Sequence, residues 1–152
     1  MSEGVTLCDV YTMPNAKEFL YRVFCERRAH TWISRTSEEV PWWEHSQFVD
    51  SRPYRYWYII YHDTTPVGEI NVTKQNEIGL AILREHQGKG FGSDTIRKFV
   101  ETHNPLPAIP SNRNGHWLAN IAINNEASKE FFRRLGFRPL METWVLEDGD
   151  AS

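Results

Sequence analysis

The segment "AILREHQGKGFGSDTIRKF", residues 81–99, places three glycines between an apolar run and a helix-like pattern. Glycine in a regular element costs roughly 0.5–1 kcal/mol relative to alanine, so a cluster of glycines needs a compensating role. A strand, a glycine-rich turn and a helix start together form an anion site, because the N–H groups of the turn converge and the helix dipole adds partial positive charge. We therefore expect the turn from Gln87 to Gly92 to hold a phosphate group, and the alternative is a plain strand-to-helix turn.

Other phosphate-binding patterns fit this segment less well. The P-loop pattern requires a Lys-Ser or Lys-Thr pair after its last glycine, and no such pair follows Gly92. A dinucleotide fingerprint needs a parallel βαβ unit at the start of the domain, whereas the segments at 54–61, 67–73 and 77–83 predict an antiparallel meander with short connections.

The remaining elements follow from apolar periodicity, turn residues and helix caps. A first strand is expected at 4–12, a helix opening at Pro14, and a second helix starting at 36–39. After the helix that follows the glycines come a long loop at 102–115, a strand at 116–123, a helix from Asn125 to Leu135 and a closing strand at 137–147. The order β-α-α-β-β-β-α-β-α-β predicts a mixed, mostly antiparallel α/β sheet with flanking helices.

Composition narrows the class of protein. The 152 residues are 40% hydrophobic and 24% charged, which fits one globular domain over residues 1–152. The net charge of −3 argues against nucleic acid as the main partner. No apolar run approaches the length of a membrane span, and residues 1–15 lack the features of a signal peptide, so we expect no membrane partner and a cytoplasmic location. The two cysteines and six scattered histidines show no ligand spacing, so no metal is expected.

Two motifs carry a resemblance to a known family. "QGKGFG", residues 87–92, resembles the acetyl-CoA signature Q/R-x-x-G-x-G/A of the GCN5-related N-acetyltransferases, and "NEASKEFFRRLGF", residues 125–137, resembles that family's second signature. The interval between the motifs and the order of the elements also fit. The resemblance covers nearly the whole chain, weakly before residue 54.

The resemblance implies a site for acetyl-CoA as co-substrate. The strand before the turn would bind pantetheine through its backbone, the turn would hold the pyrophosphate, and the second motif would line the pantetheine arm. The residues implied are Leu80, Ala81, Ile82, Gln87, Gly88, Lys89, Gly90, Phe91, Gly92, Ser93 and Asn125. A backbone N–H near Ile82 would stabilise the developing oxyanion.

The catalytic groups depart from the family pattern. Phe132 stands where the family often has a tyrosine that protonates the leaving thiolate, and Asn120 stands where some branches have a glutamate base. Glu77 lies close to the base position of another branch, so it is the candidate general base, with a solvated strand-start residue as the alternative. Glu69 is a second candidate, and base catalysis through water would need neither carboxylate.

The acceptor site is expected near the first two helices and the loop 102–115. Trp42 and Trp43 could stack on a sugar face or pack as core or lid residues, and Glu69 could contact the substrate. The sequence thus predicts an N-acetyltransferase that acetylates a primary amine directly, a small amine or an amino sugar. A protein amine remains an alternative acceptor, and a non-catalytic acyl-CoA-binding regulatory module is the rival function. A homodimer is compatible with the sequence.

Overall fold

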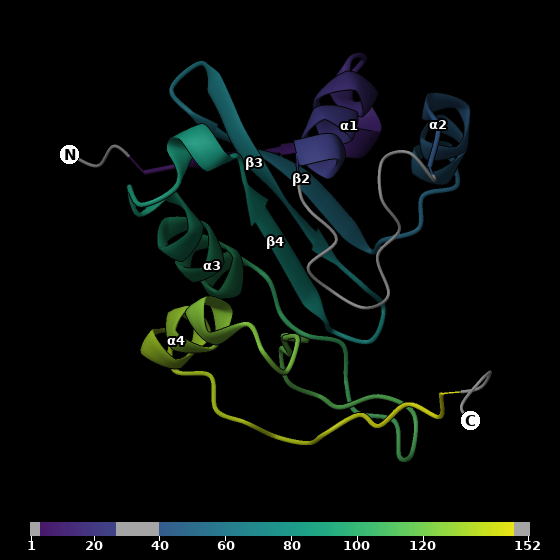
Figure 1. Ribbon diagram of the computed structural model, residues 1–152, viewed down its shortest axis with the longest axis vertical. Coiled ribbons are helices and arrows are strands. Elements are labelled where there is room, and N and C mark those ends of the chain that lie inside the picture. Colours follow the sequence, from purple (N-terminus) through teal and green to yellow (C-terminus); the bar gives the residue numbers. More distant parts are fainter. Residues whose placement is uncertain (1–3, 27–39, 148–152) are drawn as a thin grey trace.

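The computed structural model describes residues 4–26 and 40–147, and it has the expected α/β architecture (Figure 1). An antiparallel sheet lies between two pairs of helices. The strands are β1 (Thr6–Asp9), β2 (Tyr56–His62), β3 (Thr65–Val72) and β4 (Ile78–Ile82), and the helices are α1 (Ala16–Glu26), α2 (Trp42–Asp50), α3 (Phe91–Thr102) and α4 (Glu126–Arg134). Short 3-10 helices, η1 (Val10–Thr12) and η2 (Arg84–His86), follow β1 and β4.

The two faces of the sheet have different partners because side chains alternate along each strand. The strands are hydrogen-bonded in the order β1-β2-β3-β4. Ile60, Ile70 and Ile78 pack in one core cluster with residues of α3 and α4. On the opposite face, Trp57 and Ile59 pack in a second cluster with residues of α1 and α2. The two core clusters are therefore separated by a single sheet.

Two expected strands do not form. Of residues 116–123, only Leu118 pairs with the sheet, through one parallel bridge to Glu77. Beyond Leu118 the chain leaves the edge of β4, so no ladder can propagate. The segment 138–147 is exposed along most of its length and also lies outside any strand. The helix start expected at 36–39 falls outside the described residues, and α2 begins at Trp42.

No helix within the described ranges is long and apolar enough to cross a membrane.

One buried side chain holds the turn between β3 and β4 against the long loop. Asn76 is completely buried and has a left-handed backbone with φ of 68°. Its side-chain amide donates to the carbonyl oxygens of Leu106 and Asn114, at 3.0 and 2.7 Å, and its side-chain oxygen accepts from Leu106 N–H at 2.8 Å. Its backbone oxygen accepts from Leu118 N–H at 2.9 Å. Asn76 therefore fixes where the loop ends and where the chain meets β4.

We expect Asn76→Ala to lower the free energy of unfolding by about 2 kcal/mol, because three part-buried backbone groups of Leu106 and Asn114 lose their partners. Chemical denaturation measures the change. Gln75→Ala, in the exposed part of the same turn, is the control and should stay within about 0.5 kcal/mol of the parent. Equal stability of the two variants would contradict the role assigned to Asn76.

Candidate active site

The outer edge of β4 presents backbone groups that the sheet does not use. Leu83 N–H donates to the Val67 carbonyl on β3, whereas Ile78 N–H donates outward to Leu118. Backbone groups alternate in direction along an antiparallel strand, so Leu80 and Ile82 also face the outer edge. Because the chain after Leu118 leaves this edge, no described strand covers it. This uncovered edge, the gap, presents backbone donors and acceptors without a strand partner among the described residues. The side-chain amide of Gln87 donates to Ile82 O at 2.9 Å.

The glycine turn connects this edge to α3. Gly88 and Gly90 have φ angles of 78° and 88°, in the region that favours glycine, and Gly90 is the N-cap of α3. A Cβ added at either position would meet no protein atom within 4 Å, so the turn faces open space. The N-terminal N–H groups of α3 have no helical partners and point the same way. The geometry suits a bound anion, and the anion site stays a prediction.

The two sequence motifs meet in space. A Cβ on Gly92 would lie 3.2 Å from the Phe131 ring and 3.2 Å from Leu80 Cδ2, so the glycine lets α3 pack closely against α4 and β4. Asn125 caps α4, because its side-chain oxygen accepts from Ser128 N–H at 3.1 Å. The motif at 125–137 therefore packs against the first turn of α3 through Phe131, next to the glycine turn. In the turn itself Lys89 is exposed, and the Phe91 ring packs on His62 with centroids 4.8 Å apart.

A carboxylate lies on the α1–α2 face of the sheet, directly across the ladder from Ala81. Glu69 pairs with Ala81 in the register and is 7% exposed. Its oxygen Oε1 accepts from Trp57 Nε1 at 2.8 Å and from Asn71 Nδ2 at 3.0 Å. A Cβ on Gly79 would come within 2.6 Å of Asn71 Oδ1, so the space beside Gly79 is filled by the Asn71 side chain rather than left open. Sequence reasoning missed Asn71 and Trp57, whose polar groups hold the carboxylate in place.

Glu77 and Asn120 come together at the start of the gap. The Glu77 carboxylate accepts from Thr73 Oγ1 at 3.0 Å and from Asn120 Nδ2 at 3.1 Å. Each carboxylate oxygen therefore has one donor, and the group is half-buried. The candidate base thus lies beside the residue that occupies the alternative base position.

The tryptophans at the start of α2 lie on the α1–α2 side of the sheet. Trp42 is 41% exposed and packs edge-on against Tyr21, and Trp43 is 61% exposed. No contact among the described residues joins either ring to Glu69 or Glu77. His45, one turn later, is buried against Tyr21, and burial lowers the pKa of its imidazole. It is a packing residue between α1 and α2.

The comparisons with known proteins agree with this geometry. A family model described as an acetyltransferase (GNAT) domain matches residues 5–138. The chain belongs to the GNAT acetyltransferase family. Among curated proteins none matches the sequence significantly.

Solved structures show the same fold at low sequence identity. An acetyltransferase from Thermus thermophilus is 20% identical with a TM-score of 0.64, over 97% of this chain and 91% of that one. An aminoglycoside N-acetyltransferase in complex with CoA is 10% identical with a TM-score of 0.63, over 95% of each chain. A transcriptional regulator from Bacillus halodurans is 15% identical with a TM-score of 0.66, over 95% of this chain and 99% of that one.

Membership in the GNAT family makes this chain an N-acetyltransferase that uses acetyl-CoA. The residues present fit that co-substrate. The turn offers converging N–H groups and open space for phosphates, and the outer edge of β4 offers backbone partners for an extended arm with amide groups. The thioester supplies the activated acetyl group, and the protein binds and orients it.

The family's usual acid position is occupied by a core residue. Phe132 is 8% exposed and belongs to the cluster between the sheet and the helices α3 and α4. Its ring packs edge-on against Phe131 and Phe137, with centroids 5.0 Å away in each case. The side chain has no proton to give, and its surroundings are apolar.

We expect Gly90→Val to abolish CoA binding while the domain stays folded. A non-glycine residue in a left-handed conformation costs roughly 1–2 kcal/mol, and relief of that strain would turn the N–H groups away from the phosphates. Calorimetric titration with CoA measures the loss. Gly136→Ala is the strain control, because Gly136 has φ of 99° at the end of α4 and should lose stability but keep affinity. Unchanged CoA affinity in Gly90→Val would exclude the turn as the phosphate site.

We expect Phe132→Tyr to leave the maximal rate within a few-fold and to lower the free energy of unfolding by about 1–3 kcal/mol, because the added hydroxyl is buried without a partner. Steady-state kinetics and denaturation measure the two effects. A rate increase above tenfold would mean that this position reaches the leaving thiolate after all.

Proposed function

We propose that this N-acetyltransferase transfers the acetyl group directly to a primary amine on a small molecule, with amino sugars as the first class to test. The observation that carries the proposal is the buried Glu69 carboxylate across the ladder from Ala81. An amine acceptor reaches the enzyme as an ammonium ion, and a fixed carboxylate near the thioester favours binding of such a cation.

The fixed geometry around Glu69 favours a compact acceptor. Trp57 and Asn71 hold the carboxylate from two sides, and the Asn71 side chain occupies the space beside Gly79. A small cationic group fits such a restricted site better than a long flexible one. The fold is shared with an aminoglycoside N-acetyltransferase, which gives a further reason to begin with amino sugars. The exposed Trp43 ring offers a surface on which a sugar ring could stack.

Glu77 is the proposed general base. The nitrogen of the acceptor must lose a proton to attack the acetyl carbon, and the carbon–sulfur bond then breaks with the electron pair passing to sulfur. Glu77 lies at the start of the gap with its carboxylate fixed by Thr73 and Asn120. It takes the proton directly or through one water. With Phe132 in the core, we propose no dedicated acid, because a thiolate with a pKa near 8–9 leaves without much help.

A panel of acceptors tests the proposal through release of CoA thiol from acetyl-CoA. It comprises amino sugars, simple primary amines and peptides with free N-termini, and each product is identified by mass spectrometry. We expect at least one amino sugar or small amine to react faster than every peptide. Preference for peptides would assign a protein amine instead. Tight CoA binding with slow hydrolysis alone would indicate a regulatory module and overturn the proposal.

The same assay tests Glu77. Glu77→Gln keeps the shape of the side chain and removes its basicity, so kcat/KM near neutral pH should fall at least tenfold while CoA affinity stays unchanged. The loss should shrink as the pH rises toward the pKa of the acceptor amine, because free amine then forms without a base. The activity of Thr73→Ala, which keeps the carboxylate but removes one of its donors, should fall less. Parent activity in Glu77→Gln across this pH range would remove Glu77 from the mechanism.

A further inference from the structure

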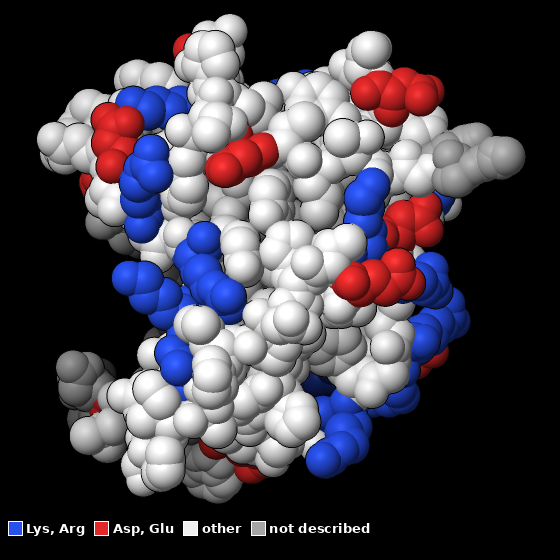
Figure 2. Space-filling model, turned by 180° about the vertical axis from the view of Figure 1, so that it is seen from behind, with Lys and Arg blue, Asp and Glu red and all other residues white. Residues whose placement is uncertain are grey.

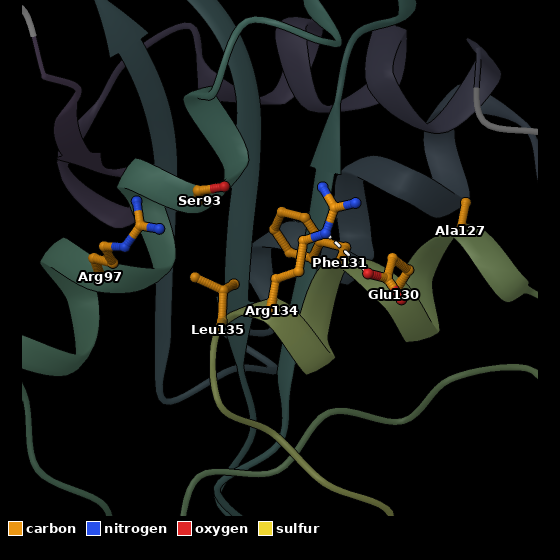
Figure 3. A pocket seen from close by; sticks show the side chains of 7 residues that line it. All are labelled: Ser93, Arg97, Ala127, Glu130, Phe131, Arg134 and Leu135. Atoms are coloured by element: carbon orange, nitrogen blue, oxygen red, sulfur yellow. Dashed lines mark hydrogen bonds and ion pairs between the residues drawn. The ribbon is translucent and has the colours of Figure 1, made fainter.

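The glycine turn from Gln87 to Gly92 is supported on two sides. On its C-terminal side the first turn of α3 faces α4, and Ser93 and Phe131 line a cavity of about 430 Å³ between these two helices (Figure 3). On its N-terminal side the support is η2, the short 3-10 helix that joins β4 to the turn. Because η2 is only three residues long, its position depends on contacts with other elements.

The N-terminus of η2 lacks a cap of its own. Within this segment His86 N–H donates to Leu83 O at 2.8 Å. Gln87 N–H donates to Arg84 O at 3.2 Å. These bonds leave the N–H of Arg84 without a partner inside η2. Leu83 is the N-cap residue, and its aliphatic side chain makes no capping hydrogen bond. The acceptor for Arg84 N–H therefore has to come from water or from another part of the chain.

Glu26, the last residue of α1, supplies this acceptor. Its oxygen Oε1 accepts from Arg84 N–H at 2.6 Å, although the two residues are 58 positions apart in sequence. A hydrogen bond from a backbone N–H to a carboxylate is shorter and stronger than one between neutral groups. The contact therefore fixes the main chain of η2 at the point where it leaves β4.

A second contact shows that the same face of α1 is directed at η2. Arg22 lies four residues before Glu26 and so shares its helix face. Its Nη2 atom lies 3.1 Å from Glu85 Oε1. The two side chains of this pair are 51% and 60% exposed, and such surface pairs contribute little to stability. The hydrogen bond of Glu26 is thus the contact that can hold the backbone of η2 in place.

The position of η2 sets the spacing between two parts of the co-substrate site. Leu83 N–H holds one end of η2 to Val67 O on β3 at 2.9 Å, and Gln87 begins the glycine turn at the other end. The Gln87 side chain donates to Ile82 O, which links the turn to the outer edge of β4. A ligand that contacts both the edge and the turn binds more tightly when their spacing is fixed in advance.

We propose that Glu26 is a positioning residue for acetyl-CoA. It caps η2 from α1 and thereby fixes the glycine turn relative to the outer edge of β4, without touching the reacting atoms. Since α1 packs on the face of the sheet that carries Trp57, one side chain connects this face to the co-substrate turn. The inference rests on the use of acetyl-CoA stated above and is independent of the acceptor.

Calorimetric titration of the full chain with CoA tests the proposal without an acceptor. We expect Glu26→Ala to weaken CoA binding about threefold to tenfold, the effect of one lost hydrogen bond. Glu26→Gln keeps an oxygen acceptor at the same place and should bind CoA at least twofold more tightly than Glu26→Ala. With an acceptor from the panel, Glu26→Ala should raise the KM for acetyl-CoA by a similar factor and leave kcat within twofold.

Hydrogen exchange at the Arg84 amide, measured by NMR, gives a readout that needs no ligand. This N–H should exchange faster in Glu26→Ala than in the parent protein, and Glu26→Gln should restore part of the protection. Unchanged exchange in Glu26→Ala would show that the carboxylate does not cap η2 and would overturn the proposal.

Arg22→Ala is the matched control. It removes the exposed contact between the same face of α1 and η2 but leaves the acceptor of Arg84 N–H in place. Its CoA affinity should stay within twofold of the parent. Parent affinity in Glu26→Ala, an equal loss in Arg22→Ala, or no recovery in Glu26→Gln would overturn the proposal. A parent protein that does not bind CoA would also overturn its use of acetyl-CoA, whereas failure of the acceptor panel alone would leave the titration unaffected.

Discussion

The hydrogen bonds of Asn76 are the constraint on which the site geometry depends. Its buried side chain ties the turn between β3 and β4 to two points of the long loop, 30 and 38 residues away in sequence. Its backbone oxygen brings Leu118 beside the start of β4. The pairing then stops after one parallel bridge, so the outer edge of β4 stays open along Leu80 and Ile82. The contact at Leu118 and the uncovered edge of β4 both follow from the hydrogen bonds of Asn76, because a chain held at one point can diverge from the strand beyond it.

The open edge can serve a reaction because β4 separates two environments. Residues with even numbers on β4 face the core beneath α3 and α4, and residues with odd numbers face the α1–α2 side with Glu69 and Asn71. The backbone between them belongs to neither face. In the proposed arrangement a thioester aligned along this edge is accessible from the α1–α2 side, and the anionic part of the same molecule lies on the glycine turn. One strand would then position both substrates.

The sequence predicted the parts of the structure whose causes are local. Three glycines between a strand and a helix indicated the turn into α3, Asn125 indicated the cap of α4, and apolar alternation indicated the meander within a few residues. The role of Asn76 could not be predicted, because in "KQN" it has the composition of an ordinary turn and its partners are distant. The expected strands at 116–123 and 137–147 have strand-like periodicity, but strand formation depends on a neighbour, and the anchor at Leu118 leads the chain away from β4. Glu26 looks in sequence like the polar end of an amphipathic helix, and only the position of α1 beside η2 brings its carboxylate to Arg84 N–H.

The distribution of charge explains how an acidic chain can take an anionic co-substrate. The net charge of −3 is an average over a surface on which basic and acidic side chains are interleaved (Figure 2). Lys17 pairs with Asp50 on the α1–α2 side of the sheet, and Arg97 pairs with Asp94 on the α3–α4 side. Because such pairs compensate one another locally, the backbone N–H groups at the glycine turn supply positive potential that a count of charged side chains does not include. The buried Glu69 carboxylate lies on the opposite face of the sheet from α3 and α4. The proposed sites for an anionic co-substrate and a cationic acceptor are therefore compatible in one acidic chain, because local geometry rather than net charge sets the potential at each of them.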